Sequence, residues 1–463
     1  MSNTNQLKVQ LFGKNIIDQI PREESHLLLA NYKIDAAVEL NATRGEPSQT
    51  IEKELGEKDI VEFEFDDGTI WVSPPQEIPA LFQNQGLSRS QSGHLMIPNA
   101  LDIPTNSRGI FRKVYLKFVK IFSPDKIIDT AAEVAAEVVA AKIESAILEF
   151  EGMNHLDNEF NLKPFKHTAF FSGINLKKPV LLLLHGTSSS TTGSFGELRG
   201  TEMWENVGKT YGENVLAFEH RTWTKSPFEN ALEVLEALPN NTKLHVVSHS
   251  RGGIVGDVLA RCSSRGTFFT NKEMEMLEKL GRQADANILK KLNKAAGEKH
   301  IKIEKFVRVA CPAAGTTILS GRIDHFLNVV LNLVGGGLAL AGQAKNPVFL
   351  GIRSLLIAIV NQRKDASVLP GLEAMIPDSP LLKVLNNHQI KIESDLAVIA
   401  GNAGVGGIKK TLATLLMRLF YQLDNDFVVD TDSMYMGVIR ENKIYYKFVE
   451  SEVVDHFSYF KNK

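Results

Sequence analysis

The chain has 463 residues, 43% of them hydrophobic and 23% charged, which are the proportions of an ordinary soluble globular protein. Its 52 basic and 54 acidic residues give a formal net charge of -2, so no overall field would draw it to nucleic acid or to an anionic membrane. Cys262 and Cys311 are the only cysteines, which predicts two small buried residues and no disulfide framework. Because the N-terminus MSNTNQLKVQLFG lacks a basic start followed by an apolar core, we expect no secretory signal and a cytoplasmic location.

Residues 1–80 are expected to form a small β-rich N-terminal module. Ile60 to Phe65 alternates apolar and acidic residues, Asp67-Gly68 supplies a turn, and Thr69 to Val72 returns as a second strand. This pattern predicts a β-hairpin with one apolar face. Nothing in the module has catalytic chemistry, so regulatory, partner-binding and purely structural roles all stay open.

Residues 81–170 are expected to hold a linker and a long helix. Gln83 to Arg108 is rich in Ser, Asn, Gln and Pro, as is typical of a linker or a long surface loop. Ser123 as a cap and Pro124 at the first helical position predict a helix start. The apolar stripe of this helix would consist of Ile128, Ala132, Ala135, Val139, Ile143, Ile147 and Phe150. Acidic residues interrupt every turn or two, which favours a bundle or docking helix over a membrane element.

From about residue 171 onward, predicted strands and helices alternate. Pro179 to Leu184 is an apolar run short enough for a strand buried on both faces, and Asn214 to Phe218 gives another strand. The helical pattern Phe228 to Leu238 follows. This alternation predicts a parallel sheet.

The stretch from Lys243 to Gly253, KLHVVSHSRGG, predicts a strand, a sharp turn and a helix start, with Ser250 at the apex. In a nucleophile elbow, the serine occupies a strained turn that lifts its hydroxyl clear of the sheet. Ser248 stands at the first glycine position of the G-x-S-x-G pattern, and Gly252 holds the second. We interpret Ser248 as tolerated because serine is small. Taken alone, the pentapeptide is a weak signal, and a helix-capping serine beside a glycine explains it equally well.

An apolar insertion is expected at about residues 317–386. It follows a charged helical stretch from Thr270 to His300 and a predicted strand from Phe306 to Ala310. Phe326 to Ala344 carries no charge, and Val348 to Val360 adds a second apolar helix. We interpret the insertion as a cap over an apolar site, and the alternative is an element that touches a membrane. Replacing Leu338 and Leu340 with Asp would test this hypothesis.

A catalytic acid and a histidine are expected after the insertion, in that order. Leu396 to Ala400 is a predicted strand, and the later loop contains Asp424, Asp426 and Asp430. Lys443 to Val449 alternates as a final strand, and the loop after it carries His456 at the carboxyl edge of the sheet.

Taken together, the region from about Pro179 to the C-terminus resembles the α/β-hydrolase lipases, in the broad group of lecithin:cholesterol acyltransferase-like and PGAP1-like enzymes. The resemblance rests on His185-Gly186-Thr187, on the elbow, on Asn425-Asp426 and on His456. Residues Pro377 to Asn386 are similar to the P-x-S-x-x-L-x-x-L-N segment of such lipases. The resemblance also favours Asp426 as the acid. Asn425-Asp426-x-x-Val429 stands where these lipases carry N-D-G-x-V, with Phe427 in place of the glycine.

The resemblance implies an α/β-hydrolase fold with a parallel-rich central sheet and helical cap insertions over residues 171–463. It implies a serine hydrolase that cleaves carboxylic esters of lipids through Ser250, Asp426 and His456 and an acyl-enzyme intermediate. The backbone N–H groups of Thr187 and Arg251 would form the oxyanion hole. An acyltransferase with the same triad and a non-catalytic binding protein of the same fold stay open as alternatives.

The expected partners follow from this interpretation. The substrate would be a lipid or another ester, with no cofactor and no metal, and His185, His220 and His249 are interpreted as packed or turn residues. Peripheral membrane contact through the apolar cap belongs to the alternative interpretation. The N-terminal module suggests coupling to a protein partner that the sequence does not name.

Overall fold

The computed structural model describes residues 6–20, 32–40, 49–83, 88–104, 111–124, 132–164, 175–264, 268–319, 323–336, 347–362, 369–387, 389–403, 411–412, 415–416, 425–442, 444–451 and 455–461. The chain divides into two compact units, and each unit is assembled from three separate stretches of sequence. The first unit comprises Met1–Ile143, Arg322–Asp365 and Ile408–Gln422. The second comprises Glu144–Gly321, Ala366–Gly407 and Leu423–Lys463.

The first unit is built on a sheet with the strand order β3-β1-β2-β8-β4-β5, in which neighbouring strands run antiparallel. Its strands are β1 (Leu7–Asn15), β2 (Tyr32–Glu39), β3 (Gln49–Leu55), β4 (Ile60–Phe65), β5 (Ile70–Ser73), β6 (Leu95–Met96), β7 (Ala100–Pro104) and β8 (Phe111–Pro124). The predicted hairpin is confirmed as β4 and β5. The short strand β6 pairs with β1, and β7 pairs with β8.

Two expectations for this part of the sequence are wrong. The predicted linker from Gln83 to Arg108 contains β6 and β7, and Ser123 and Pro124 end β8 instead of starting a helix. Ser123 pairs with Lys33 and Pro124 with Tyr32, so cross-strand pairing outweighs the local capping signal. Residues 125–131 lie outside the described residues, and helix α3 runs from Ala132–Ile147.

The first sheet therefore extends well past the expected module boundary at residue 80. β8 lies between β2 and β4, so residues 1–80 cannot form this sheet without residues 111–124. The division between the two units falls inside α3, between Ile143 and Glu144.

Helices α10 (Ile323–Gly336) and α11 (Pro347–Gln362) belong to the first unit and pack on β4 and β5. Asn328 and Asn332 of α10 pair with the backbone of β5: their amide nitrogens donate to the carbonyls of Val72 and Ile70, and their amide oxygens accept from the N–H groups of the same two residues. Each asparagine thus takes the place of a neighbouring strand along the edge of β5.

A buried ion pair adds to this packing. The Arg353 guanidinium of α11 binds the Glu62 carboxylate of β4, at 2.5 Å from Nε and 2.9 Å from Nη2. Burial opposes ionisation of Glu62, yet Arg353 and Lys120 hold the pKa of its carboxyl below the ordinary value.

The expectation of a cap over the active site is therefore corrected for residues 322–365. Most of the described apolar side chains of this stretch, which belongs to the first unit, are buried, among them Phe326, Leu327, Val330, Leu331, Ile352, Leu355 and Leu356. Their apolar character follows from packing within this unit, so it no longer argues for a lid. Leu338 and Leu340 lie outside the described residues. Within the described parts of the chain, none of the helices combines the length and apolar character that a membrane crossing requires.

The second unit is built on a sheet with the strand order β10-β9-β12-β11-β13-β14-β15-β16. From β12 to β16 the neighbouring strands are parallel, whereas β9 and β10 at the other end are antiparallel. The strands are β9 (Gly152–Leu156), β10 (Leu162–Pro164), β11 (Val180–Leu184), β12 (Val215–Glu219), β13 (Lys243–His249), β14 (Lys302–Val309), β15 (Asp395–Ala403) and β16 (Ile444–Ser451). Each strand predicted from the apolar runs of this region is confirmed to within a few residues.

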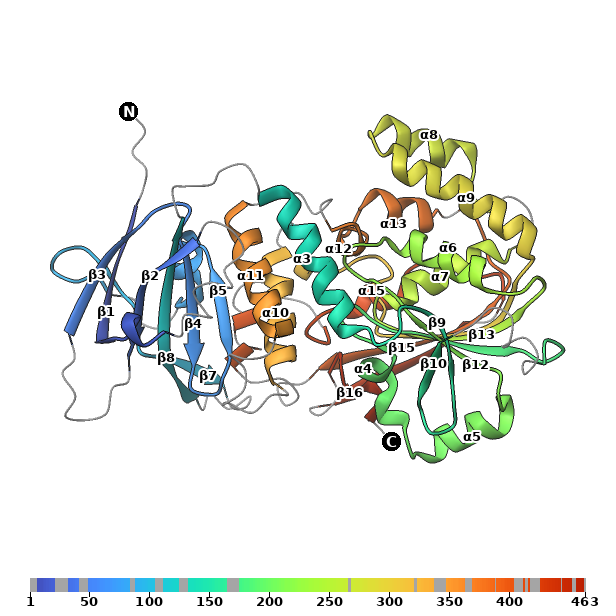
Figure 1. Cartoon of the computed structure of the whole chain (residues 1–463), viewed down its shortest axis with the longest axis horizontal. Helices are drawn as coiled ribbons and strands as arrows, with labels where there is room; N and C mark the ends of the chain where they lie inside the picture. The colour runs from blue at the N-terminus through green and yellow to red at the C-terminus, as the bar shows by residue number, and fades with distance from the viewer. Residues whose placement is uncertain are drawn as a thin grey trace. The chain divides into compact units, whose positions relative to one another are not determined.

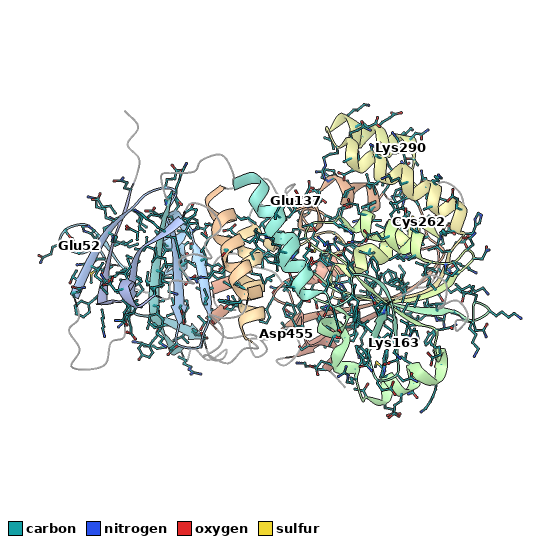
Figure 2. All side chains as sticks on the ribbon, in the orientation of Figure 1. Glu52, Glu137, Lys163, Cys262, Lys290 and Asp455 are labelled. Carbon is teal, nitrogen blue, oxygen red and sulfur yellow. The ribbon has the colours of Figure 1, made fainter. Side chains whose placement is uncertain are left out.

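Helices cover both faces of this sheet, with α5 on one side and α6 and α7 on the other (Figure 1). The helices are α4 (Thr191–Phe195), α5 (Glu202–Tyr211), α6 (Pro227–Ala237), α7 (Gly252–Cys262), α8 (Asn271–Lys279), α9 (Gln283–Lys299), α12 (Pro370–Glu373), α13 (Pro380–Leu385) and α15 (Thr431–Tyr435). Side chains fill the space between the sheet and these helices (Figure 2).

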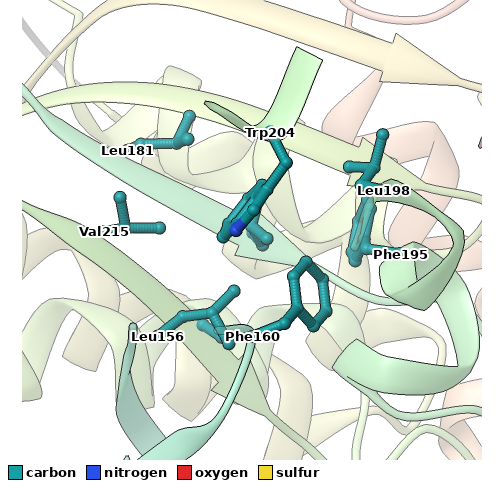
Figure 3. Close-up of a cluster of buried hydrophobic side chains, with 9 residues drawn as sticks. Leu156, Phe160, Leu181, Phe195, Leu198, Trp204 and Val215 are labelled. Atoms are coloured by element: carbon teal, nitrogen blue, oxygen red, sulfur yellow. The ribbon is translucent and has the colours of Figure 1, made fainter. Parts of the chain in front are cut away.

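Figure 3 shows the core on one face of the sheet, where β11 and β12 present Leu181 and Val215 to Trp204 of α5. These side chains share one cluster with Leu156, Phe160, Leu183, Phe195, Leu198 and Ala217. The chain moves from β11 to β12 on one side and then to β13 on the other, so the strand order reverses at β11. In open α/β sheets, sites lie at the carboxyl ends of strands beside such a reversal. The mostly parallel strand order, with helices on both faces, is that of the α/β-hydrolase fold.

Candidate active site

Ser250 occupies a strained turn between β13 and α7. Its φ of 51° lies in the left-handed region that residues other than glycine seldom adopt. The Ser250 N–H donates to the Val309 carbonyl at 2.9 Å, and the Ser250 carbonyl accepts from the Gly253 N–H at 2.8 Å. The turn thus has the geometry of a nucleophile elbow, as the sequence predicts.

Three glycines make room for this elbow. A Cβ on Gly252 would lie 2.3 Å from the Leu184 carbonyl oxygen, and one on Gly253 would lie 2.4 Å from the sulfur of Cys311. A Cβ on Gly186, in the loop after β11, would lie 2.9 Å from the Cβ of Ser250. All three distances are too short for a side chain, so glycine is required where the strand, the loop and the helix converge.

His456 connects Ser250 to Asp426. Its Nε2 lies 2.8 Å from the Ser250 Oγ, and its Nδ1 lies 2.8 Å from the Asp426 Oδ2. The side chains of all three residues are buried. The carboxylate can only accept, so the neutral imidazole carries its hydrogen on Nδ1, and Nε2 is left to accept the serine proton. The structure therefore brings together the three side chains that the sequence analysis selected.

The loop that carries the acid is fixed by its own backbone. The Asp426 Oδ1 accepts from the N–H groups of Val428 at 3.2 Å and Val429 at 2.8 Å, which leaves Oδ2 for the imidazole. Phe427 has a φ of 77°, in the left-handed region that favours glycine. The loop therefore takes this shape at the cost of backbone strain, while the Phe427 ring is buried.

Asp430, one of the two alternative acids, binds other partners. The Asp430 carboxylate binds the Thr317 N–H at 2.8 Å and the Thr317 hydroxyl at 2.9 Å, which ties two loops together. Asp424 lies outside the described residues.

Two residues that the sequence analysis did not assign to the site hold the triad in place. The His249 Nε2 donates to the carbonyl of His456 at 2.7 Å, and the Tyr459 hydroxyl donates to the Asp426 Oδ2 at 3.2 Å. Burial and the neighbouring His456 lower the pKa of His249 to about 3, so its imidazole is neutral. Burial, followed by the charge of Asp426, raises the pKa of Tyr459, which keeps the phenol protonated as a donor. No local sequence motif marks either role.

The expected oxyanion donors lie on either side of the elbow. Arg251 directly follows Ser250 and caps the N-terminus of α7, and Thr187 lies in the loop after β11. Among the residues that the structure describes, neither backbone N–H has a protein acceptor. The Arg251 side chain points elsewhere: its buried guanidinium donates to the carbonyls of Gly371 and Lys225 and to the Asn230 amide oxygen. Burial lowers the pKa of this guanidinium to about 9.

His185 and His220 form a packed pair. Their rings stack with centroids 4.0 Å apart, and the His185 Nε2 accepts from the His220 N–H at 3.0 Å. Burial lowers the pKa of both imidazoles. This geometry agrees with their interpretation as packed residues.

The segment similar to P-x-S-x-x-L-x-x-L-N forms α13 and its cap. The Ser379 hydroxyl accepts from the Leu382 N–H, and Pro380 takes the first helical position. Leu382 and Leu385 are buried, and the Asn386 amide donates to the carbonyl of Ala313 at 2.7 Å. The motif therefore attaches this helix to the loop after β14.

Within the described residues, a group of possible metal ligands lies in the first unit, in Glu77, Asp324 and His325, whose ligand atoms lie within 4.8 Å of one another. The His325 Nε2 is 3.2 Å from the Glu77 Oε2 and 3.7 Å from the Asp324 Oδ2. The imidazole thus lies within contact distance of both carboxylates.

A sequence family described as "Domain of unknown function (DUF7379)" matches residues 151–274 and 287–463, which include the entire candidate site. The chain belongs to this family. The family match covers most of the second unit together with residues 322–365 and 408–422 of the first. The DUF7379 match begins within the second unit and leaves the N-terminal sheet outside it. A comparison with curated proteins finds no match.

Several solved structures are similar to part of this chain. An alpha/beta hydrolase family protein from Desulfitobacterium hafniense is 14% identical over 62% of this chain and 91% of its own, with a TM-score of 0.32. Lipase 1 from Pelosinus fermentans is 14% identical over 60% of this chain and 92% of its own, with a TM-score of 0.36. A lipase from Bacillus licheniformis is 14% identical over 65% and 91%, with a TM-score of 0.27. The fold assignment rests on the strand order and the elbow, not on these similarities.

Proposed function

We propose that the protein is a serine hydrolase that cleaves carboxylic esters, with Ser250 as nucleophile, His456 as general base and Asp426 as the acid that orients the base. The two hydrogen bonds of His456 carry this proposal, because they join a serine on a strained elbow to a buried carboxylate. Three separate stretches of sequence converge to make this arrangement.

The chemistry follows from the hydrogen positions. As the Ser250 oxygen attacks the ester carbonyl, its proton moves to the His456 Nε2, and Asp426 stabilises the resulting imidazolium. The oxyanion would be bound by the backbone N–H groups of Thr187 and Arg251, and each such donor typically lowers the barrier by about 3 kcal/mol. The imidazolium returns the proton to the leaving alcohol, which leaves an acyl-enzyme. Water, deprotonated by His456, then releases the acid and restores the serine.

We further propose lipid esters as the substrate class. The support is the resemblance of Asn425-Asp426 and of the Pro377–Asn386 segment to lipases. The apolar insertion does not support this proposal over residues 322–365, since the described apolar side chains there pack within the first unit.

The test is labelling of the full chain with a fluorophosphonate probe, followed by assays on p-nitrophenyl esters of increasing chain length and on phospholipid vesicles. Ser250→Ala and His456→Ala should abolish turnover, and Asp426→Asn should retain more activity than either. Asp430→Asn is the matched control and should leave turnover within a few-fold of the wild type. Full labelling of Ser250→Ala would refute the serine hydrolase. Clear preference for short soluble esters would refute the lipid substrate and leave a plain esterase. Analysis of the reaction products should find the free acid.

A further inference from the structure

The loop that carries the proposed oxyanion donor Thr187 is itself strained. Its next residue, Ser188, has a φ of 58°, and such a conformation persists only where the surroundings impose it. Two hydrogen bonds do so: the Ser188 N–H donates to the Thr222 hydroxyl at 3.0 Å, and the Ser188 hydroxyl accepts from the Trp223 indole N–H at 2.7 Å. The position of the Thr187 backbone therefore depends on residues 222 and 223, in the loop after β12.

That second loop is held by one buried carboxylate. Glu144, in the last turn of α3, accepts through Oε1 from the backbone N–H groups of Thr222 and, at 2.7 Å, of Trp223. Its Oε2 accepts from the Thr224 hydroxyl at 2.6 Å and from the Thr224 N–H at 3.3 Å. The Glu144 side chain is only 2% exposed, so these donors replace its water. Hydrogen bonds to an ionised carboxylate are roughly twice as strong as neutral ones.

We propose that Glu144 is a positioning residue for the oxyanion hole, an inference that rests on the proposed function. Glu144 fixes Thr222 and Trp223, these two fix Ser188 in its left-handed conformation, and Ser188 in turn fixes the adjacent N–H of Thr187. An oxyanion donor must be held within about 0.5 Å of its productive position, so loosening this chain of contacts slows the chemical step.

A purely structural role for Glu144 makes a different prediction. If the carboxylate only anchors α3, its loss lowers the fraction of folded protein, while each folded molecule reacts at the normal rate. If it positions the oxyanion loop, every molecule still reacts, but more slowly. The rate constant and the end point of active-site labelling separate these two roles.

The experiment measures fluorophosphonate labelling of Ser250 in the full chain, together with kcat and KM on p-nitrophenyl butyrate. For Glu144→Gln, whose amide oxygen still accepts from two of the N–H groups, we expect a labelling rate about tenfold lower at an unchanged end point. For Glu144→Ala we expect a loss of about 100-fold, mainly in kcat. The control is Glu229→Gln: the Glu229 carboxylate also accepts a backbone N–H, that of Ser226, but contacts neither Thr222 nor Trp223. It should label at the wild-type rate.

A second pair of variants tests the connection to Ser188 without altering the carboxylate. Trp223→Phe and Ser188→Ala each remove one partner of the same hydrogen bond, so each should slow labelling about fivefold, and the double variant should be no slower than either single one. Additive losses would overturn the proposed route. A wild-type labelling rate in Glu144→Gln, or a reduced end point at an unchanged rate, would overturn the role of Glu144. Absence of wild-type labelling at Ser250 would instead refute the proposed serine hydrolase.

Discussion

At the scale of single residues, Ser250 combines the nucleophile with a strained backbone. Its φ of 51° costs a residue with a Cβ on the order of 1–2 kcal/mol, and glycine avoids this cost. Such strain is typical of active sites, where the orientation of a side chain outweighs stability.

We therefore expect Ser250→Gly to be more stable than Ser250→Ala by about 1 kcal/mol, although both variants are inactive. The two variants lose the same hydroxyl and differ mainly in the strain, so their difference in the free energy of unfolding isolates it. Thermal unfolding of both variants would measure this difference. Equal stabilities would show that the elbow is not strained.

Tyr459 is a second residue whose effect can be predicted. Its hydroxyl donates to the Asp426 oxygen that also accepts from His456, so its removal leaves that oxygen with one donor fewer. A hydrogen bond to a charged group is worth about 1.5–3 kcal/mol, and part of this should appear in the transition state, where the imidazolium forms.

Tyr459→Phe should lower kcat about three- to tenfold and change KM less than twofold, as measured with p-nitrophenyl butyrate. Tyr211→Phe is the matched control, because the Tyr211 hydroxyl also lies in a hydrogen bond, at 2.7 Å from the His245 Nδ1. If Tyr459→Phe has the same kcat as the wild type, the prediction is wrong, and the backbone donors orient Asp426 without the Tyr459 hydroxyl.

At the scale of elements, α10 acts as a partner for the edge of β5. Asn328 and Asn332 lie four residues apart, on one face of the helix, and they meet Val72 and Ile70, which lie two residues apart on one side of the strand. The helical repeat and the strand repeat match at this spacing. The asparagines in an otherwise apolar run are thereby explained by the backbone groups that they satisfy.

Replacing both Asn328 and Asn332 with Ala should destabilise the first unit by at least about 2 kcal/mol, because four buried backbone groups lose their partners. Hydrogen exchange of the Ile70 and Val72 amides should accelerate, and mass spectrometry of the corresponding peptide would detect it. Asn287→Ala, on the exposed face of α9, is the control. Unchanged exchange at β5 in the double variant would mean that the edge is protected by other contacts.

At the scale of the whole molecule, three buried histidines link stability to pH. Burial lowers the pKa of His185, His220 and His249, to about 3 for His249 from an ordinary value of 6.5. In the unfolded chain these side chains take up protons near pH 6.5, whereas in the folded protein they remain neutral. Their contribution is therefore complete above pH 6.5 and is lost as the pH falls from 6.5 toward the folded pKa values.

For His249, the free energy of unfolding should fall by up to about 1.4 kcal/mol per pH unit between pH 6.5 and its folded pKa of about 3, and His185 and His220 should add to the fall in the same direction. His249→Gln removes one of the three, so its melting temperature should fall less steeply than that of the wild type between pH 6.5 and 5. Thermal unfolding across this range would measure the two slopes. Parallel slopes would contradict a neutral, buried His249.

The sequence by itself predicted the strands of the parallel part of the second sheet and selected the three side chains that the structure brings together at the elbow. Its apolar runs predict β11, β12, β13, β14, β15 and β16, because a strand buried on both faces leaves a local signal. Ser250, Asp426 and His456 follow from short motifs in a fixed order, and the glycines that the elbow requires lie within a few residues of the serine. These features depend on neighbours in the sequence.

The tertiary structure decided the features that depend on distant residues. Ser123 and Pro124 have the local pattern of a helix start, yet they end a strand. Their cross-strand partners, Lys33 and Tyr32 of β2, lie 90 and 92 residues earlier in the chain. Residues 322–365 have the composition of a lid, yet the described apolar side chains there pack within a unit whose strands come earlier in the chain. Glu144 meets Thr222 across a separation of 78 residues, and a single carboxylate in a helix gives no local sign of such a contact. Burial and pairing between remote segments outweigh local propensity at each of these positions, and only the folded chain shows which segments meet.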